Sequence, residues 1–150
     1  MIGDIPLYLV DNNALFRFPP AMRTSNEFRR VVRLPSEVIH EAGQYATRYD
    51  LSPLEYRPTP TVLRHLKVVM NQVPTDGFEL IDLYAGEGAA DPLLVACALD
   101  AAKQRSQLLV GEVYTVVSDD IAVREACERH QVRWMSAADF AEELSQKHSD

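Results

Sequence analysis

Residues 113–135 read VYTVVSDDIAVREACERHQVRWM, and they contain the pattern that decides the fold. The β-branched run at 113–117 predicts a strand, residues 121–130 predict a helix, and residues 132–135 predict a second short strand. Strands that alternate with helices of about ten or more residues are typical of parallel sheets covered by helices. This alternation begins near residue 78, so the sequence predicts an α/β fold with a mostly parallel sheet.

The rest of the chain carries weaker signals of the same architecture. Residues 7–10 predict a buried strand, residues 31–34 predict an extended segment before Pro35, and 78–83 could form another strand. Residues 52–60 contain three prolines and are expected to form a connection. Helices are predicted at 13–18 (ending before Pro19-Pro20), within 22–30, at 37–49 after an N-cap at Ser36, at 61–73, at 91–104 starting with Asp91-Pro92, and after a capping box at Ser136 and Asp139.

Length and composition are those of an ordinary globular protein. The 150 residues predict one domain, 47% of them are hydrophobic, and no apolar run approaches the length that spans a membrane. The N-terminus lacks the pattern of a signal peptide, so the expected location is the cytoplasm. The net charge of −7 argues against simple electrostatic wrapping of nucleic acid, but it does not exclude a nuclease whose carboxylates bind metal.

The cysteines and histidines do not point to a metal site. Cys97 and Cys127 lie in apolar, helix-like stretches and are expected to be small buried hydrophobes. No His or Cys spacing matches a zinc site, because the histidines are scattered at 40, 65, 130 and 148.

Acidic residues follow apolar runs or open helices at four places. Asp11 ends the first predicted strand, and Asp119 and Asp120 follow the strand at 113–117, while Glu41 and Asp91 lie in or at the start of helices. Carboxylates at the carboxyl ends of parallel strands converge on one crevice. The usual partner of such a cluster is a hard divalent cation with oxygen ligands.

Each acid also has a simpler reading. Asp11 could hydrogen-bond turn amides, Asp91 is a good helix N-cap, and one of Asp119 and Asp120 could cap the next helix. Glu41 within a helix could be a solvated residue, and Glu37 lies on the same face as a rival.

Four segments, in order, resemble the motifs of PIN domains. They are DNNAL at 11–15, PSEVIHE at 35–41, GEGAADPLLVACA at 86–98 and VVSDDIAVR at 116–124. The resemblance selects Glu41, Asp91 and Asp120 beside Asp11, with Ser118 in a position where the family has Thr. Asp119 stands where Asn is common, which leaves open whether Asp119 or Asp120 is the ligand, and Glu87 is an additional acid without an assigned role.

The resemblance implies an α/β/α sandwich and a metal-dependent ribonuclease. Small PIN proteins are often the VapC-type toxins of toxin–antitoxin pairs, so it also implies a small antitoxin partner and a homodimer. One or two Mg²⁺ or Mn²⁺ ions are expected, with Asp11 and Asp91 as the firmest ligands and Glu41 and Asp120 acting directly or through water. Asn13 and Ser118 would orient these ligands.

Basic residues cluster between Arg17 and Arg33, where only Glu27 opposes them. The simpler reading of this cluster is a solvated, salt-bridged face. The candidates for contacts with RNA phosphates are Arg23, Arg29, Arg30 and Arg33.

Three other functions are alternatives, and the sequence barely distinguishes the first of them from a toxin. One is a stand-alone RNA-processing PIN nuclease, and another is a PIN-like module that binds RNA or protein without cleaving. A haloacid dehalogenase-type phosphatase would need a second Asp where this chain has Asn13, and it would need a catalytic Lys where Lys103 and Lys147 are poorly placed.

Overall fold

The computed structural model describes residues 4–43, 51–57, 59–71, 90–107 and 111–149, with side chains placed for all of these except 43, 90, 91 and 147–149. The described strands form one parallel sheet in the order β3-β2-β1-β4-β5. The strands are β1 (Ile5–Val10), β2 (Val32–Pro35), β3 (Glu55–Tyr56), β4 (Glu112–Val117) and β5 (Trp134–Met135).

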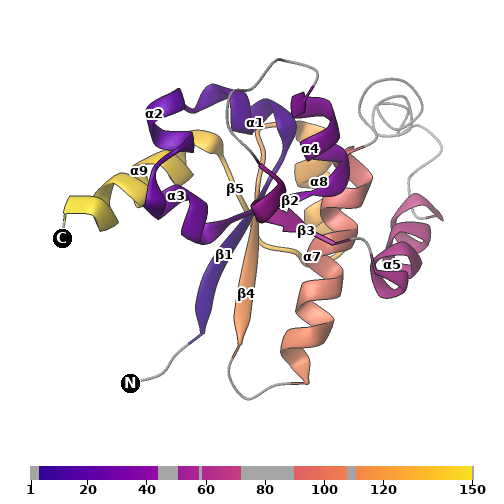
Figure 1. The fold of residues 1–150 in the computed structure, drawn as a ribbon. Coiled ribbons are helices and arrows are strands. Elements are labelled where there is room, and N and C mark those ends of the chain that lie inside the picture. The colour runs from indigo at the N-terminus through magenta and orange to yellow at the C-terminus, as the bar shows by residue number, and fades with distance from the viewer. Residues whose placement is uncertain (1–3, 44–50, 58, 72–89, 108–110, 150) are drawn as a thin grey trace.

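Helices cover both faces of the sheet (Figure 1). The described helices are α1 (Asn12–Arg17), α2 (Pro20–Arg23), α3 (Asn26–Val31), α4 (Ser36–Gly43), α5 (Pro60–Asn71), α7 (Ala90–Ser106), α8 (Ile121–Arg129) and α9 (Ala137–Ser149). A 3-10 turn, η1, spans Ser52–Leu54. The predicted α/β/α sandwich with a parallel sheet is therefore confirmed.

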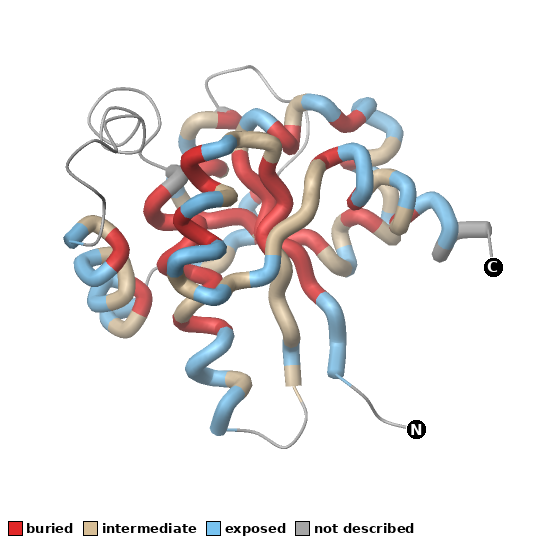
Figure 2. Tube along the Cα trace, turned by 180° about the vertical axis from the view of Figure 1, so that it is seen from behind, coloured by how far each residue is buried: buried red, intermediate tan, exposed pale blue. Residues whose placement is uncertain are grey.

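Strand β1 forms the centre of the core and is buried on both faces. Tyr8 and Val10 pack with residues of α1, α3, α4 and α9, while Leu9 packs with residues of α5, α7 and α8. Figure 2 shows this as a buried central sheet within helices whose outer sides are exposed. A strand covered on both faces needs apolar side chains at successive positions, which explains the continuous run before Asp11.

The pairing of β1 with β4 brings the two acid-bearing strand ends together. Leu9 aligns with Val116 and Val10 with Val117, so Asp11 and Ser118 are the next residues on neighbouring strands. The backbone N–H of Asp11 donates to the carbonyl of Val117 at 3.2 Å, which extends the pairing by one step.

Several local predictions are corrected by the structure. The connection predicted at 52–60 contains η1 and the edge strand β3. Pro20 does not only stop a helix but is the first residue of α2, a position that its fixed φ favours. Ser36 is the first residue of α4 rather than its cap, while the predicted strand at 78–83 lies outside the described residues.

Two further predicted helix starts differ in outcome. The helix expected from Asp91-Pro92 is α7, but it begins at Ala90, so Asp91 is its second residue rather than its N-cap. The Oγ of Ser136 accepts the N–H of Asp139 at 3.1 Å, as expected at the start of the last helix. Among the described helices, none is long and apolar enough to cross a membrane.

Candidate functional site

Asp11 lies at the carboxyl end of β1 and is almost completely buried, with 2% of its surface exposed. Its Oδ1 accepts the backbone N–H of Ala14 at 2.7 Å and thereby caps α1. Its Oδ2 accepts a hydrogen bond from the Oγ of Ser118. The simpler reading of Asp11 as a cap is therefore correct for one oxygen, while the other oxygen is held by the neighbouring strand.

Ser118 links the acids on the two strands. It is fully buried directly after β4, where its hydroxyl donates to Asp11 and accepts the backbone N–H of Asp120 at 3.1 Å. Its own N–H donates to the carbonyl of Met135 at 3.0 Å, which fixes it between β4 and β5. This geometry supports the expected orienting role of Ser118.

Asp119 and Asp120 make different contacts. Asp119 accepts Nη1 of Arg17 with Oδ2 at 2.8 Å and the N–H of Ala137 with Oδ1 at 3.1 Å, so it joins α1 to the start of α9. Asp120 caps α8, because its Oδ1 accepts the N–H of Ala122 at 2.8 Å and of Val123 at 3.3 Å. The Oδ2 of Asp120 accepts no hydrogen bond from a described residue. Both oxygens of Asp119 are therefore engaged by described residues, whereas only one oxygen of Asp120 is.

The electrostatic environment of Asp11 disfavours its negative charge. Burial raises the pKa of Asp11 above its usual range, and the charges of Asp120 and Asp119 raise it further. The hydrogen bonds from Ser118 and Ala14 act in the opposite direction and only partly offset burial. Three carboxylates thus interact at one end of the sheet, where a cation would relieve both burial and repulsion.

The other two predicted ligands are only partly described. Glu41 lies on α4 and is partly buried, whereas its rival Glu37 is exposed. Asp91 is the second residue of α7, and its side chain lies outside the described part of the chain. Helix α7 begins near the end of the sheet where β1 and β4 finish (Figure 1). Among the side chains that the structure places, no group of three or more His, Cys, Asp or Glu is arranged to hold a metal ion.

The remaining predicted residues are not gathered in one place, and Arg33 lines the cavity that also contains Glu112 at the start of β4. Asn13 is exposed on the first turn of α1. Arg23 is buried with its guanidinium 5.2 Å from the ring centre of Phe16, and Nη1 of Arg33 donates to the Val32 carbonyl at 2.7 Å. Of the predicted basic group, Arg30 is exposed, whereas Arg29 and Arg33 are partly buried.

Arg17 is the residue of this region that the sequence-based assignment of the site did not select. It ends α1, the helix that Asp11 caps, and forms an ion pair with Asp119. The sequence did contain a signal for Arg17. It ends a short helix that begins directly after Asp11, so a cation follows a candidate ligand by about one and a half helical turns.

Cys97 and Cys127 are buried, as expected for small hydrophobes. Burial raises the pKa of each thiol to about 12, so both are protonated near neutral pH and neither is a candidate nucleophile.

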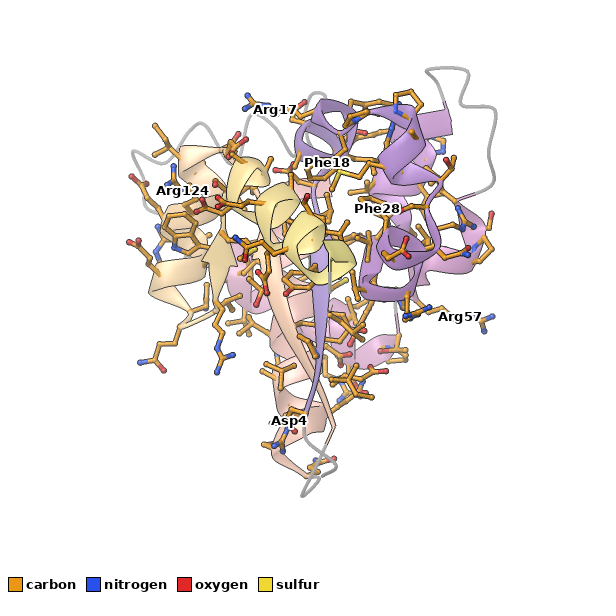
Figure 3. All side chains as sticks on the ribbon, turned by 90° about the vertical axis from the view of Figure 1, so that its left-hand side faces the viewer. Asp4, Arg17, Phe18, Phe28, Arg57 and Arg124 are labelled. Atoms are coloured by element: carbon orange, nitrogen blue, oxygen red, sulfur yellow. The ribbon has the colours of Figure 1, made fainter. Side chains whose placement is uncertain are left out.

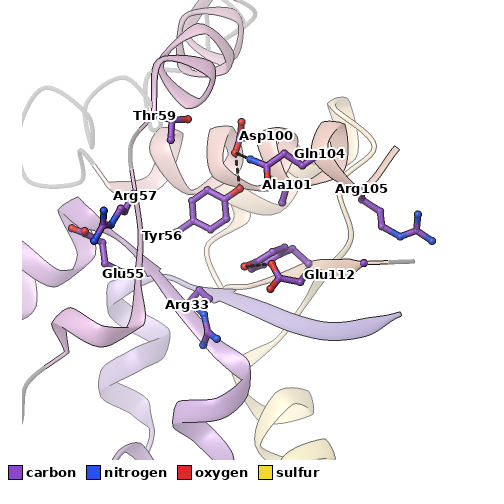
Figure 4. A pocket seen from close by; sticks show the side chains of 12 residues that line it. Arg33, Glu55, Tyr56, Arg57, Thr59, Asp100, Ala101, Gln104, Arg105 and Glu112 are labelled. Atoms are coloured by element: carbon purple, nitrogen blue, oxygen red, sulfur yellow. Dashed lines mark hydrogen bonds between the residues drawn. The ribbon is translucent and has the colours of Figure 1, made fainter. Parts of the chain in front are cut away.

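A cavity of about 490 Å³ lies between α7 and the strands on the α7 side of the sheet (Figure 4). Some of its polar groups have partners within the protein, although the buried Oδ1 of Asp100 accepts no hydrogen bond from a described residue. Asp100 is buried, and its Oδ2 accepts the hydroxyl of Tyr56 at 2.6 Å and Nε2 of Gln104 at 2.8 Å. Arg105 in its wall pairs with Asp4 at 2.8 Å. The acidic strand ends are the stronger candidate for the functional site, because three carboxylates interact there.

The bond between Tyr56 and Asp100 is expected to stabilise the fold. Tyr56→Phe keeps the ring but removes a donor from a buried carboxylate, and should lower the free energy of unfolding by about 1–3 kcal/mol. Tyr114→Phe is the matched control, because its hydroxyl lies 3.3 Å from the exposed Glu112 and should contribute less than about 1 kcal/mol. Urea unfolding of both variants measures the difference, and equal losses would contradict the structural role of Asp100.

Comparison with known proteins adds no family assignment. No protein-family model matches the chain, and no curated protein sequence is significantly similar to it. The class that the fold and site define is a parallel α/β protein with a carboxylate cluster at the carboxyl ends of its central strands.

Proposed function

We propose that this protein is a metal-dependent endoribonuclease that uses Mg²⁺ or Mn²⁺. The observation that carries the proposal is Asp11, a buried carboxylate that lies beside Asp120 and Asp119 at the ends of two adjacent parallel strands. A carboxylate gains nothing from burial at this position unless a cation or a set of donors compensates it. Its two hydrogen bonds compensate it only in part, because its pKa is still raised.

The oxygen atoms around Asp11 fit a hard divalent cation. Asp11 and Asp120 supply carboxylates, and the neighbouring Asn12 has a buried Oδ1 that accepts no hydrogen bond from a described residue. Mg²⁺ typically takes one or two carboxylates and keeps several waters, so Asp11 and Asp120 suffice for one ion. Glu41 and Asp91 remain proposed ligands on the evidence of sequence, and they would allow a second ion.

The residues would divide the work of phosphodiester cleavage. When bound, the metal makes a water nucleophilic near neutral pH and stabilises charge on the phosphate. Asp11 would hold the ion at a fixed position, because capping of α1 and the Ser118 hydroxyl determine where its carboxylate lies. Ser118 would fix the positions of Asp11 and Asp120 relative to each other, since its hydroxyl contacts both residues.

Cleavage of a structured RNA by the purified protein tests the proposal, with Mn²⁺, Mg²⁺ or EDTA present. Cleavage that requires metal and is lost in Asp11→Asn and Asp120→Asn would support it. Glu128→Gln is the matched control, because Glu128 is an exposed acid on the same helix that Asp120 caps. Binding of RNA without cleavage would favour a non-catalytic module, and turnover of small phosphomonoesters would favour a phosphatase.

We further propose that the nuclease is the toxin of a toxin–antitoxin pair and acts as a homodimer with a small antitoxin as its partner. Its support is the resemblance of four segments to the motifs of PIN domains, whose small members are often VapC-type toxins. Induced expression in bacteria should then arrest growth, and Asp11→Asn should abolish the arrest. Normal growth despite metal-dependent cleavage in vitro would favour a stand-alone RNA-processing enzyme.

A further inference from the structure

Arg17 places an exposed cation next to the acidic site. Its Nη1 lies 2.8 Å from Oδ2 of Asp119, and its side chain is 64% exposed. Asp119 is close enough to Asp11 for its charge to raise the pKa of Asp11. Figure 3 shows Arg17 at the end of the molecule opposite Asp4, which precedes β1, so Arg17 lies at the end where β1 and β4 finish.

An ion pair this exposed contributes little to folding. The guanidinium has five N–H donors, and the bond to Asp119 engages Nη1. The exposed part of the side chain is therefore available to a second anion. Asp119 is itself held by the N–H of Ala137, so it fixes the orientation of the guanidinium before any ligand arrives.

The negative charge of the site explains why a cationic side chain is needed there in addition to a metal ion. Asp11, Asp119 and Asp120 would repel the phosphates of RNA, and a divalent ion offsets only part of that charge. A guanidinium presents a planar set of donors that matches two phosphate oxygens. We infer that Arg17 contacts a phosphate of the RNA at the acidic site, with Asp119 as the carboxylate that positions it. This rests on the proposed function and adds a residue for substrate recognition to it.

A purely structural role for Arg17 makes different predictions. If Arg17 only joined α1 to α9 through Asp119, removing either partner would destabilise the fold similarly and affect RNA similarly. In the phosphate role the two variants differ. Arg17→Ala loses a cation that binds RNA, whereas Asp119→Asn keeps an acceptor for Ala137 and removes a charge that competes with phosphate for Arg17.

The test measures binding of a mixed-sequence single-stranded RNA by fluorescence anisotropy, in protein inactivated by Asp11→Asn and at several salt concentrations. Adding Arg17→Ala should weaken binding about tenfold at low salt and reduce the slope of log affinity against log salt by about 0.7. Arg17→Lys should restore part of the affinity, and Asp119→Asn should strengthen binding. Arg129→Ala is the matched control, because Arg129 is exposed at the far end of α8.

Kinetics in the active protein provide a second readout. Arg17→Ala should raise KM more than it lowers kcat, and its melting temperature should stay near that of Arg129→Ala.

Equal RNA affinity and salt slope for Arg17→Ala and Arg129→Ala would overturn the inference, as would equal losses of binding in Arg17→Ala and Asp119→Asn. If the wild-type protein cleaves no RNA but Arg17→Ala still weakens binding, the proposed function fails and the phosphate contact stands. Failure of the Asp11→Asn protein to bind RNA would overturn the contact.

Discussion

Replacing Asp11 with Asn is expected to abolish metal-dependent cleavage and, without metal, to stabilise the fold at neutral pH. Activity should fall by at least about a hundredfold, since loss of residues that only support metal ligands already costs about 10–100-fold. Asn can still accept the N–H of Ala14, so the cap of α1 is retained. The two effects have opposite signs because the charge that would bind the metal is unfavourable in its absence.

The pH dependence of this stabilisation follows from the raised pKa of Asp11. The folded protein binds the proton more tightly than the unfolded chain, whose Asp has the ordinary value of 3.8. Stability of the wild type therefore falls as pH rises from about that value through the folded pKa, and it stays reduced above it. Asn does not titrate, so the advantage of Asp11→Asn should grow across this window and then remain constant.

Thermal unfolding in EDTA at several pH values measures the effect, and each kcal/mol gained should raise the melting temperature by about 2–4 °C. Glu128→Gln, which removes an exposed acid, should leave the profile almost unchanged. A lower stability of Asp11→Asn at neutral pH would mean that Asp11 is mainly a structural cap.

Mn²⁺ is expected to stabilise the wild-type fold by binding only the folded state. At a free concentration about a hundredfold above Kd, the gain is about 2.7 kcal/mol, or a rise of about 5–10 °C in melting temperature. Asp11→Asn should lose most of this rise, and Asp120→Asn should lose part of it. A melting temperature that does not change with millimolar Mn²⁺ would count against a metal site.

The layers of the fold could be predicted because the sequence patterns that indicate its strands and helices are local. The apolar run before Asp11 and the strand–helix–strand pattern from 113 to 135 are readable within short windows. Strand β3 was missed because it has only two residues, Glu55 and Tyr56, in a proline-rich stretch without alternation. Its pairing with β2 forms across the fold and leaves no local signal.

The proximity of Asp11 to the acids after β4 could be predicted from the sequence, but the contacts of the neighbouring acids could not. Asp119 and Asp120 have identical chemistry, so the sequence alone left the choice between them open. The contacts that separate them come from Arg17, 102 residues away, and from Ala137, 18 residues away. Such partners depend on how α1 and α9 pack. The roles of Glu41 and Asp91 as ligands stay predictions from the sequence.

The most direct test of the metal site is anomalous diffraction from a crystal soaked in Mn²⁺. The account predicts a peak within coordination distance of Asp11, about 2.0–2.2 Å from a carboxylate oxygen, with Asp120 rather than Asp119 facing the ion. The same map would reveal whether Glu41 and Asp91 reach it. A fully soaked crystal without a peak at Asp11, or with Mn²⁺ bound only elsewhere, would contradict the central claim that these strand ends form a divalent metal site.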